Sequence, residues 1–173
     1  GYIHALEPGQ RTGQILRYNT QNNPTIFHDA ASPYSIPYRS LYSKNIDNLF
    51  FAGRNISVSH MALCSTRVMG TCAILGQAIG TAAACALRTK CQTPREVLSH
   101  IKRLQQELLE DDCFLPGIKR EIPALTLQAE TKVSSGNYQA LHSGTDRQLG
   151  NQDNSWTCAP GDWIEYSFST PVE

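Results

Sequence analysis

The sequence of 173 residues lacks any run of lysine and arginine, and its charges balance at 15 basic and 15 acidic residues. Proteins that bind nucleic acid concentrate basic residues against the phosphate backbone. We therefore expect no nucleic-acid partner. This length, with 40% hydrophobic residues, is expected to give one or two small domains with an ordinary hydrophobic core.

The sequence also lacks any C-x-x-C pair and any histidine at zinc-finger spacing, although it has six cysteines. We therefore expect no metal site. Most of the cysteines are interpreted as small apolar core residues. A disulfide between Cys91 and Cys113 stays open, and with it the redox compartment and the localisation. The acidic residues at 110–112 do not have the spacing of a calcium loop and are interpreted as a solvated helix end.

The most informative segment of the sequence is residues 48–87, which predicts a strand, a polar loop and a helix in succession. The apolar run Leu49–Ala52, which stops at Gly53, predicts a short strand buried on both faces. From Met69 to Leu87 small and apolar residues follow one another without proline, which predicts a buried helix of about 19 residues. The polar loop between them lies where strand ends and helix N-termini bind anionic or polar ligands.

Four motifs of this region occur in a fixed order: IPYRSL at Ile36–Leu41, AGR at Ala52–Arg54, a long run at Ser57–Cys72, and a G-Q-A-x-G-T-A-A-A segment at Gly76–Ala84. Together they resemble the carboxyl-terminal end of the flavin-binding domain in the FAD-dependent oxidoreductase family related to the fumarate reductase and glutathione reductase flavoproteins. The likeness covers about residues 34–117. It implies an α/β fold, the C-terminal portion of an FAD/NAD(P)-binding, Rossmann-like domain with a long buried helix.

The resemblance also implies site residues and FAD as the cofactor of the parent protein. His60 and Arg67 are the candidate catalytic residues, because imidazole titrates near neutral pH and a guanidinium attracts anions. A structural, hydrogen-bonded role for His60 stays open. The helix N-terminus would face the pyrimidine ring of the flavin, where its dipole stabilises negative charge. The candidate cofactor-binding residues are Gly53, Arg54, Asn55, Ser65, Met69, Gly70, Thr71 and Cys72.

No G-x-G-x-x-G motif is present, and this is the turn that holds the pyrophosphate of the cofactor. The chain begins without an initiator methionine, and Gly1–His4 lacks the features of a signal peptide. We therefore expect a fragment of a longer flavoprotein, inactive alone and purified without FAD. Its expected partners are the rest of the flavoprotein chain and a small-molecule substrate, whose identity the sequence leaves unknown.

The same helix matches a second pattern, because Gly76-x-x-x-Gly80 in a nearly uncharged segment also occurs in membrane-spanning dimers. Gln77 and the many small residues make insertion marginal, so we expect no membrane span. Small residues at 72, 76, 80 and 84 form a stripe at a spacing of four. This stripe predicts close approach of a backbone or a flavin.

The flanking segments are simpler. Residues 1–33 are interpreted as two short strands, around Ile15-Leu16 and Ile26-Phe27, joined by turns and ending a substrate-covering domain. His28 and Asp29 are interpreted as polar loop or strand-end groups, with a catalytic role as the alternative. Residues 34–41 are expected to form an extended connector whose Arg39 makes an ion pair or lies near the flavin.

A second helix is predicted over residues 94–110. Thr93 and Glu96 suggest a capping box with Pro94 at the first helical position. Apolar residues follow at helical spacing, and Pro116-Gly117 lies beyond the expected end near Glu110. The apolar stripe consists of Val97, Ile101, Leu104 and Leu108.

Beyond Pro123 the pattern becomes strand-like, with alternation at 126–133 and again at 163–168. The tail resembles the start of a discoidin-like or related carbohydrate-binding β-sandwich. Trp156 and Trp163 would then stack on a glycan or pack in a core. The predicted organisation is 1–33, 34–120 as the C-terminal part of the FAD-binding domain, and 121–173 as a partial all-β module. A glycan- or partner-binding module on a non-catalytic scaffold is the alternative function.

Overall fold

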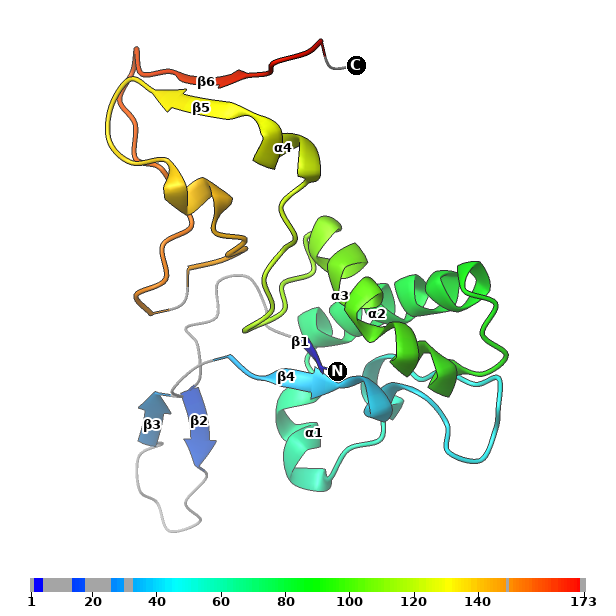
Figure 1. Ribbon diagram of the computed structural model, residues 1–173. Coiled ribbons are helices and arrows are strands. Elements are labelled where there is room, and N and C mark those ends of the chain that lie inside the picture. Colours follow the sequence, from blue (N-terminus) through cyan, green and yellow to red (C-terminus); the bar gives the residue numbers. More distant parts are fainter. Residues whose placement is uncertain (1, 5–13, 18–25, 30–32, 149, 172–173) are drawn as a thin grey trace. The chain divides into compact units, whose positions relative to one another are not determined.

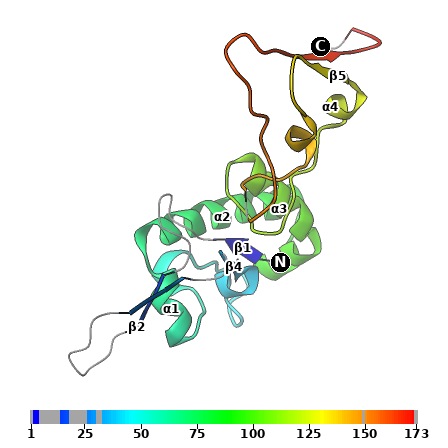
Figure 2. The same cartoon turned by 90° about the vertical axis from the view of Figure 1, so that its left-hand side faces the viewer.

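The computed structural model describes residues 2–4, 14–17, 26–29, 33–148 and 150–171. The chain divides into two compact units, one ending at Gly117 and the other beginning at Ile118. Figures 1 and 2 show the helices α1–α3 in the first unit and the β5–β6 ribbon in the second. The turns predicted around Pro8, Gly13 and Asn22 lie outside the described residues.

Two small antiparallel sheets open the first unit. Strand β2 (Gln14–Arg17) pairs with β3 (Ile26–Asp29), with Ile15 opposite His28. The two strands predicted in this region are therefore confirmed, and His28 and Asp29 belong to the second of them. Strand β1 (Tyr2–His4), which the sequence did not predict, pairs with β4 (Ser35–Pro37).

The connector turns after β4. It forms the 3₁₀ turn η1 (Tyr38–Leu41), so only its first half is extended as predicted. The strand predicted at Leu49–Ala52 is wrong. An isolated bridge joins Tyr42 to Phe50, and Leu49 and Ala52 are exposed. A strand buried on both faces needs neighbours on both sides, and the described chain supplies hydrogen bonds on one edge only.

The loop predicted at 53–68 is more ordered than expected. It contains the 3₁₀ turn η2 (Gly53–Asn55) and a helix, α1 (His60–Thr66). Helix α2 (Met69–Arg88) follows and matches the predicted bounds within one residue. Its predicted burial is wrong, because 28% of its apolar window is buried in the first unit.

The core of the first unit lies between α2 and the segment that follows it. That segment is a 3₁₀ turn, η3 (Pro94–His100), continued by α3 (Ile101–Glu110), so the predicted end of the helix is confirmed. Proline at its first turn is also confirmed, and Glu96 accepts hydrogen bonds from the Gln92 N–H and the Thr93 hydroxyl. The fully buried side chains shared by these elements include Leu75, Ala78, Ala82, Val97, Leu104 and Leu108.

The cysteines differ from expectation. None of the six forms a disulfide, so the Cys91–Cys113 disulfide is not formed. Cys85 and Cys113 are buried, whereas Cys64 and Cys158 are exposed. The interpretation of most cysteines as core residues is therefore wrong, because Cys64 lies on the exposed side of the short helix α1 and Cys158 in an exposed segment outside helices and strands. In the part of the chain that the structure describes, no cluster of His, Cys, Asp or Glu could hold a metal ion.

The second unit is less regular. Helix α4 (Ala124–Gln128) occupies the first half of the strand predicted from Thr126, which begins instead as β5 (Glu130–Val133). Strand β5 pairs antiparallel with β6 (Ile164–Ser167), and the 3₁₀ turn η4 (Gln139–His142) lies between them in sequence. The described residues of this unit thus contain a short helix beside two paired strands, and the partial all-β module stays a prediction. Pro123 is the N-cap of α4, and its carbonyl accepts a hydrogen bond from the Leu127 N–H at 3.2 Å, which closes the turn that the strand prediction missed.

The two tryptophans of the second unit, Trp156 and Trp163, lie in different environments. The Trp156 indole N–H donates to the Ser135 carbonyl at 2.9 Å, and the Trp163 side chain is 51% exposed. Neither is buried in a core. Glycan binding by this region stays a prediction.

One helix of the described chain, α2, is long and apolar enough to cross a membrane by length and composition alone. The core helix of a soluble protein passes the same test. Since α2 packs along one side on η3 and α3, it has a protein neighbour on that side. The absence of a membrane partner stays a prediction.

Candidate functional site

The segment from Gly53 to Cys72 begins with a left-handed residue. Gly53 has φ of +81°, a conformation that side chains of L-residues rarely adopt, and it turns the chain from Ala52 into η2. A Cβ at this glycine would lie 3.9 Å from Cβ and Sγ of Cys72. The structure therefore places η2 directly beside the first turn of α2, so the two ends of the predicted site are adjacent.

Helix α1 begins with a side-chain cap. The Ser59 hydroxyl accepts a hydrogen bond from the Ala62 N–H at 3.3 Å, and the Leu63 N–H donates to the Ser59 carbonyl at 2.9 Å. Such a serine satisfies helix donors that have no partner within the helix. It fixes His60 at the first position of α1, where its side chain is exposed.

Helices α1 and α2 share a joint of two residues. Arg67 caps the C-terminus of α1, with its N–H donating to the Leu63 carbonyl, and Val68 is the N-cap of α2. The Cys72 N–H closes the first turn of α2 on the Val68 carbonyl at 2.9 Å. A valine side chain has no hydrogen-bonding atom, so it offers the first turn of α2 no cap.

The connector before this region anchors α1. The Tyr34 hydroxyl forms a hydrogen bond with the Ser65 hydroxyl, which also donates to the Ala62 carbonyl. Ser65 is thereby held in place by a residue 31 positions earlier. Neither Tyr34 nor Ser59 was predicted as a site residue. Ser59 is of a residue type that is common at helix starts, so it could have indicated α1, whereas Tyr34 carries no local signal for its contact with Ser65.

The electrostatics of the segment come from its composition. No aspartate or glutamate occurs between Asp47 and Glu96, whereas Arg54 and Arg67 lie inside the segment. Both guanidinium groups are exposed and have no ion-pair partner among the described residues. An exposed guanidinium with its five donors in a fork attracts carboxylate and phosphate groups. The arrangement is therefore suited to an anionic ligand.

The predicted site residues fall into two groups. Buried or half-buried next to one another are Gly53, Gly70, Thr71 and Cys72, around the start of α2. The other predicted site residues are exposed and lie on η2, on α1, in the joint and at the first position of α2; they are Arg54, Asn55, His60, Ser65, Arg67 and Met69, the last 88% exposed. Their assigned roles in cofactor binding and catalysis stay predictions.

Comparison with known proteins completes the assignment. No curated protein and no solved structure matches the chain. The family described as FAD dependent oxidoreductase matches residues 4–108, which is more than half of the chain and includes the whole candidate site. This family has a Rossmann-like α/β fold. The chain belongs to the FAD dependent oxidoreductase family.

Proposed function

We propose that residues 53–72 form the part of a flavoprotein oxidoreductase that contacts the flavin. The observation that carries this proposal is the adjacency of η2 and the first turn of α2, inside the region that matches the family. The rest of the flavoprotein then provides the pyrophosphate turn and the substrate cavity.

The residues present fit such a cofactor by their chemistry. The segment combines a helix start whose N-cap Val68 makes no side-chain hydrogen bond, two guanidinium groups and a stretch without carboxylates, a set that favours an electron-rich or anionic group. The left-handed Gly53 presents a surface without a side chain beside Cys72. FAD, when bound, would supply a ring that accepts electrons from the substrate.

Each residue then has a defined task. The N–H groups of Met69 and Thr71, with the α2 dipole behind them, stabilise negative charge on the pyrimidine side of the ring. Arg54 and Arg67 bind anionic groups of cofactor or substrate, and Asn55 and Ser65 add hydrogen bonds. His60, on the exposed first turn of α1, takes up or releases a proton.

Substitution of the arginines tests the proposal. In the flavoprotein that carries this segment, Arg54→Ala or Arg67→Ala should cost about 1.5–3 kcal/mol in flavin binding or turnover, the scale of hydrogen bonds to a charged group. Flavin content from absorbance near 450 nm and kcat/KM are the measurements. Lys102→Gln, which removes an exposed charge from α3, is the matched control. Unchanged flavin content and kinetics in both arginine variants would refute the role.

The chain of 173 residues alone should be colourless after purification, because it has no G-x-G-x-x-G turn. An absorbance spectrum of the purified chain checks this. Stoichiometric flavin in that sample would contradict this expectation, because the chain would then bind FAD without a G-x-G-x-x-G turn.

A further inference from the structure

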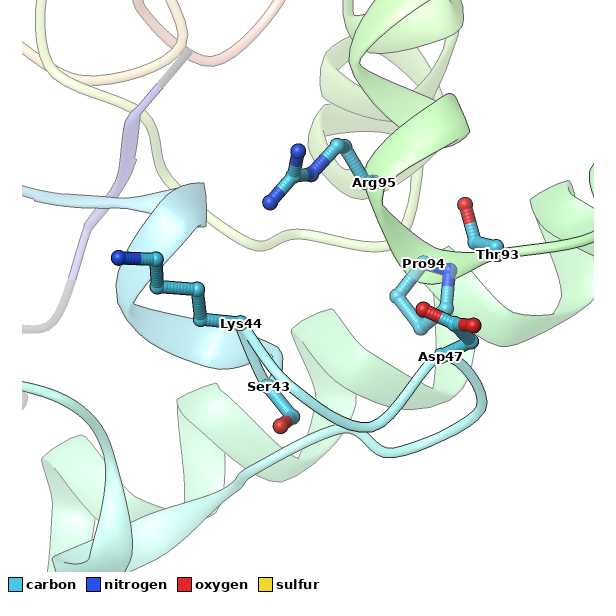
Figure 3. Close-up of a pocket in the computed structure, with 6 residues that line it drawn as sticks. All are labelled: Ser43, Lys44, Asp47, Thr93, Pro94 and Arg95. Atoms are coloured by element: carbon cyan, nitrogen blue, oxygen red, sulfur yellow. The ribbon is translucent and has the colours of Figure 1, made fainter.

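A second polar site lies in the first unit, outside residues 53–72. It is a pocket of about 190 Å³ between the turn after η1 and the start of η3. Three residues of each segment line it, and Figure 3 shows their side chains. A pocket of this volume accommodates a small molecule rather than a dinucleotide. The lining residues are Ser43, Lys44, Asp47, Thr93, Pro94 and Arg95.

Hydrogen bonds fix the turn that forms one wall of the pocket. The Ser43 hydroxyl accepts from the N–H groups of Asn45 and Ile46, at 3.2 and 2.9 Å. The Ser43 N–H in turn donates to the Leu49 carbonyl at 2.9 Å. Lys44 and Asp47 therefore project from a closed turn.

The other wall is equally fixed. The Pro94 carbonyl accepts a hydrogen bond from the fully buried Tyr38 hydroxyl at 2.8 Å. The two oxygens of Glu96 accept from the Gln92 N–H and the Thr93 hydroxyl, at 2.8 and 3.1 Å. Glu96 is therefore engaged in its own turn and does not neutralise the neighbouring Arg95.

The charges around the pocket are unbalanced. Figure 3 shows the side chains of Lys44 and Arg95 extending toward the same side, whereas Asp47 lies beside Thr93 and Pro94. Neither cation forms an ion pair with a carboxylate in the described part of the chain. Two cations from segments about fifty residues apart thus line one pocket with a single carboxylate, Asp47, and neither is paired with it among the described residues, so this arrangement attracts an oxyanion.

We propose that this pocket binds a small oxyanion, the carboxylate or phosphate group of a metabolite, between Lys44 and Arg95. The Arg95 guanidinium offers two parallel N–H donors to an oxyanion, and the Lys44 ammonium adds a point charge. The Asp47 carboxylate repels a bound anion, so we expect the pocket to favour anions of low charge. The site is independent of the flavin proposal, since it shares no residue with 53–72.

Titration of the full chain with inorganic phosphate, followed by calorimetry at constant ionic strength, tests the proposal. Lys44→Gln and Arg95→Gln should each weaken phosphate binding about tenfold, the effect of losing one charge-assisted hydrogen bond. Asp47→Asn should tighten it, because a repelling carboxylate is removed. The side chains of Lys44, Arg95 and Asp47 are all exposed, so their replacement leaves the fold intact.

Lys102→Gln is the matched control, because it removes one exposed cation that does not line the pocket. Its affinity should equal that of the unmodified chain. The proposal is overturned if no phosphate binding is detected, or if Lys102→Gln weakens binding as much as Lys44→Gln and Arg95→Gln.

Discussion

The two units of this chain are stabilised in different ways. All the buried apolar side chains of the described residues lie in the first unit, between Ile36 and Leu115. In the second unit, described from Ile118 to Pro171 without residue 149, only Gly144 is buried. That unit contains an ion pair between Arg120 and Asp146 at 3.0 Å, the β5–β6 ladder and a set of turn hydrogen bonds.

This difference between the units shows how much apolar burial, on the one hand, and hydrogen bonds and ion pairs, on the other, contribute to stability. Apolar burial contributes about 25 cal/mol per Å² and makes unfolding cooperative, whereas an isolated hydrogen bond or exposed ion pair contributes about 1 kcal/mol or less. Backbone geometry is nevertheless strict in the second unit. A Cβ at Gly144, which has φ of +70°, would lie 2.5 Å from the Arg120 carbonyl oxygen. We therefore expect the first unit to melt cooperatively and the second to open locally.

The largest expected effect comes from the core. Leu104→Ala in α3 should lower the free energy of unfolding by about 2–5 kcal/mol, because it leaves a cavity in a fully buried site. Leu127→Ala in α4 is the matched substitution in the second unit, where the side chain is 67% exposed, and it should cost less than 1 kcal/mol. Urea denaturation followed by circular dichroism measures both. Equal losses would remove the contrast between the units.

The next effect concerns the buried phenol of Tyr38. Tyr38→Phe leaves the Pro94 carbonyl without its hydrogen bond and should cost about 1–3 kcal/mol. Burial raises the pKa of Tyr38 above its ordinary value of 10.0. The protonated phenol therefore stabilises the fold fully below pH 10, and this contribution is lost as the pH rises further.

Urea denaturation of the unmodified chain and of Tyr38→Phe, at pH 8 and at pH 11, tests the direction of this pH dependence of stability. The loss of stability between these pH values should be smaller in Tyr38→Phe than in the unmodified chain. A larger loss in the variant would contradict a buried, protonated Tyr38.

A smaller effect is expected at the stripe of small residues on α2. The sequence predicted close packing there, which would make Gly80→Leu far worse than Gly80→Ala. In the structure no atom other than the adjoining residues and backbone of α2 itself lies within 4 Å of a Cβ at Gly76 or Gly80, so close packing against the described residues is wrong. Both substitutions should stabilise the chain by up to about 1 kcal/mol through helix propensity.

Thermal melting of Gly80→Ala and Gly80→Leu, in buffer without detergent, compares the two. Similar increases in Tm would confirm an open face. A marked decrease for leucine alone would show that another surface covers this side of α2, and a need for detergent would support the membrane alternative.

The smallest effect is expected in the turn before β6. Hydrogen bonds from the Ala159 N–H and the Ser134 hydroxyl, both at 2.7 Å, lower the pKa of Asp162. The ionised carboxylate therefore stabilises the turn above its unfolded pKa, and this contribution is lost as the pH falls through the lower, folded value. The protection factor of the Trp163 amide, which is its NMR hydrogen-exchange rate compared with the intrinsic rate at each pH, should fall between pH 6 and pH 2.5. Asp162→Asn should show no such acid-dependent step.

Elements set by local sequence were predictable. Twenty residues without charge or proline before Arg88 determined α2, and Pro116-Gly117 limited α3. Elements that depend on neighbours were not. The apolar run at 49–52 has the composition of a strand but lacks the partners that would make it one. An apolar helix predicts burial, yet only contacts decide how many of its faces are covered.

The candidate site was predictable to a similar degree. Motifs gave the family and the residues from Gly53 to Cys72, but not α1, because His60–Thr66 is short and rich in residues with modest helix propensity. The contact between Gly53 and Cys72 and the bond between Tyr34 and Ser65 join distant positions. Such pairs follow from the fold and have no local signal.

The stretch without acidic residues has a consequence for chromatography. Residues 48–95 contain five cationic side chains and no carboxylate, so the rest of a chain with zero net charge has an excess of five acidic groups. Proteins bind to ion exchangers through local patches rather than through their net charge. At neutral pH, close to its isoelectric point of about 7.1, the chain should therefore be retained by both cation and anion exchangers at low salt.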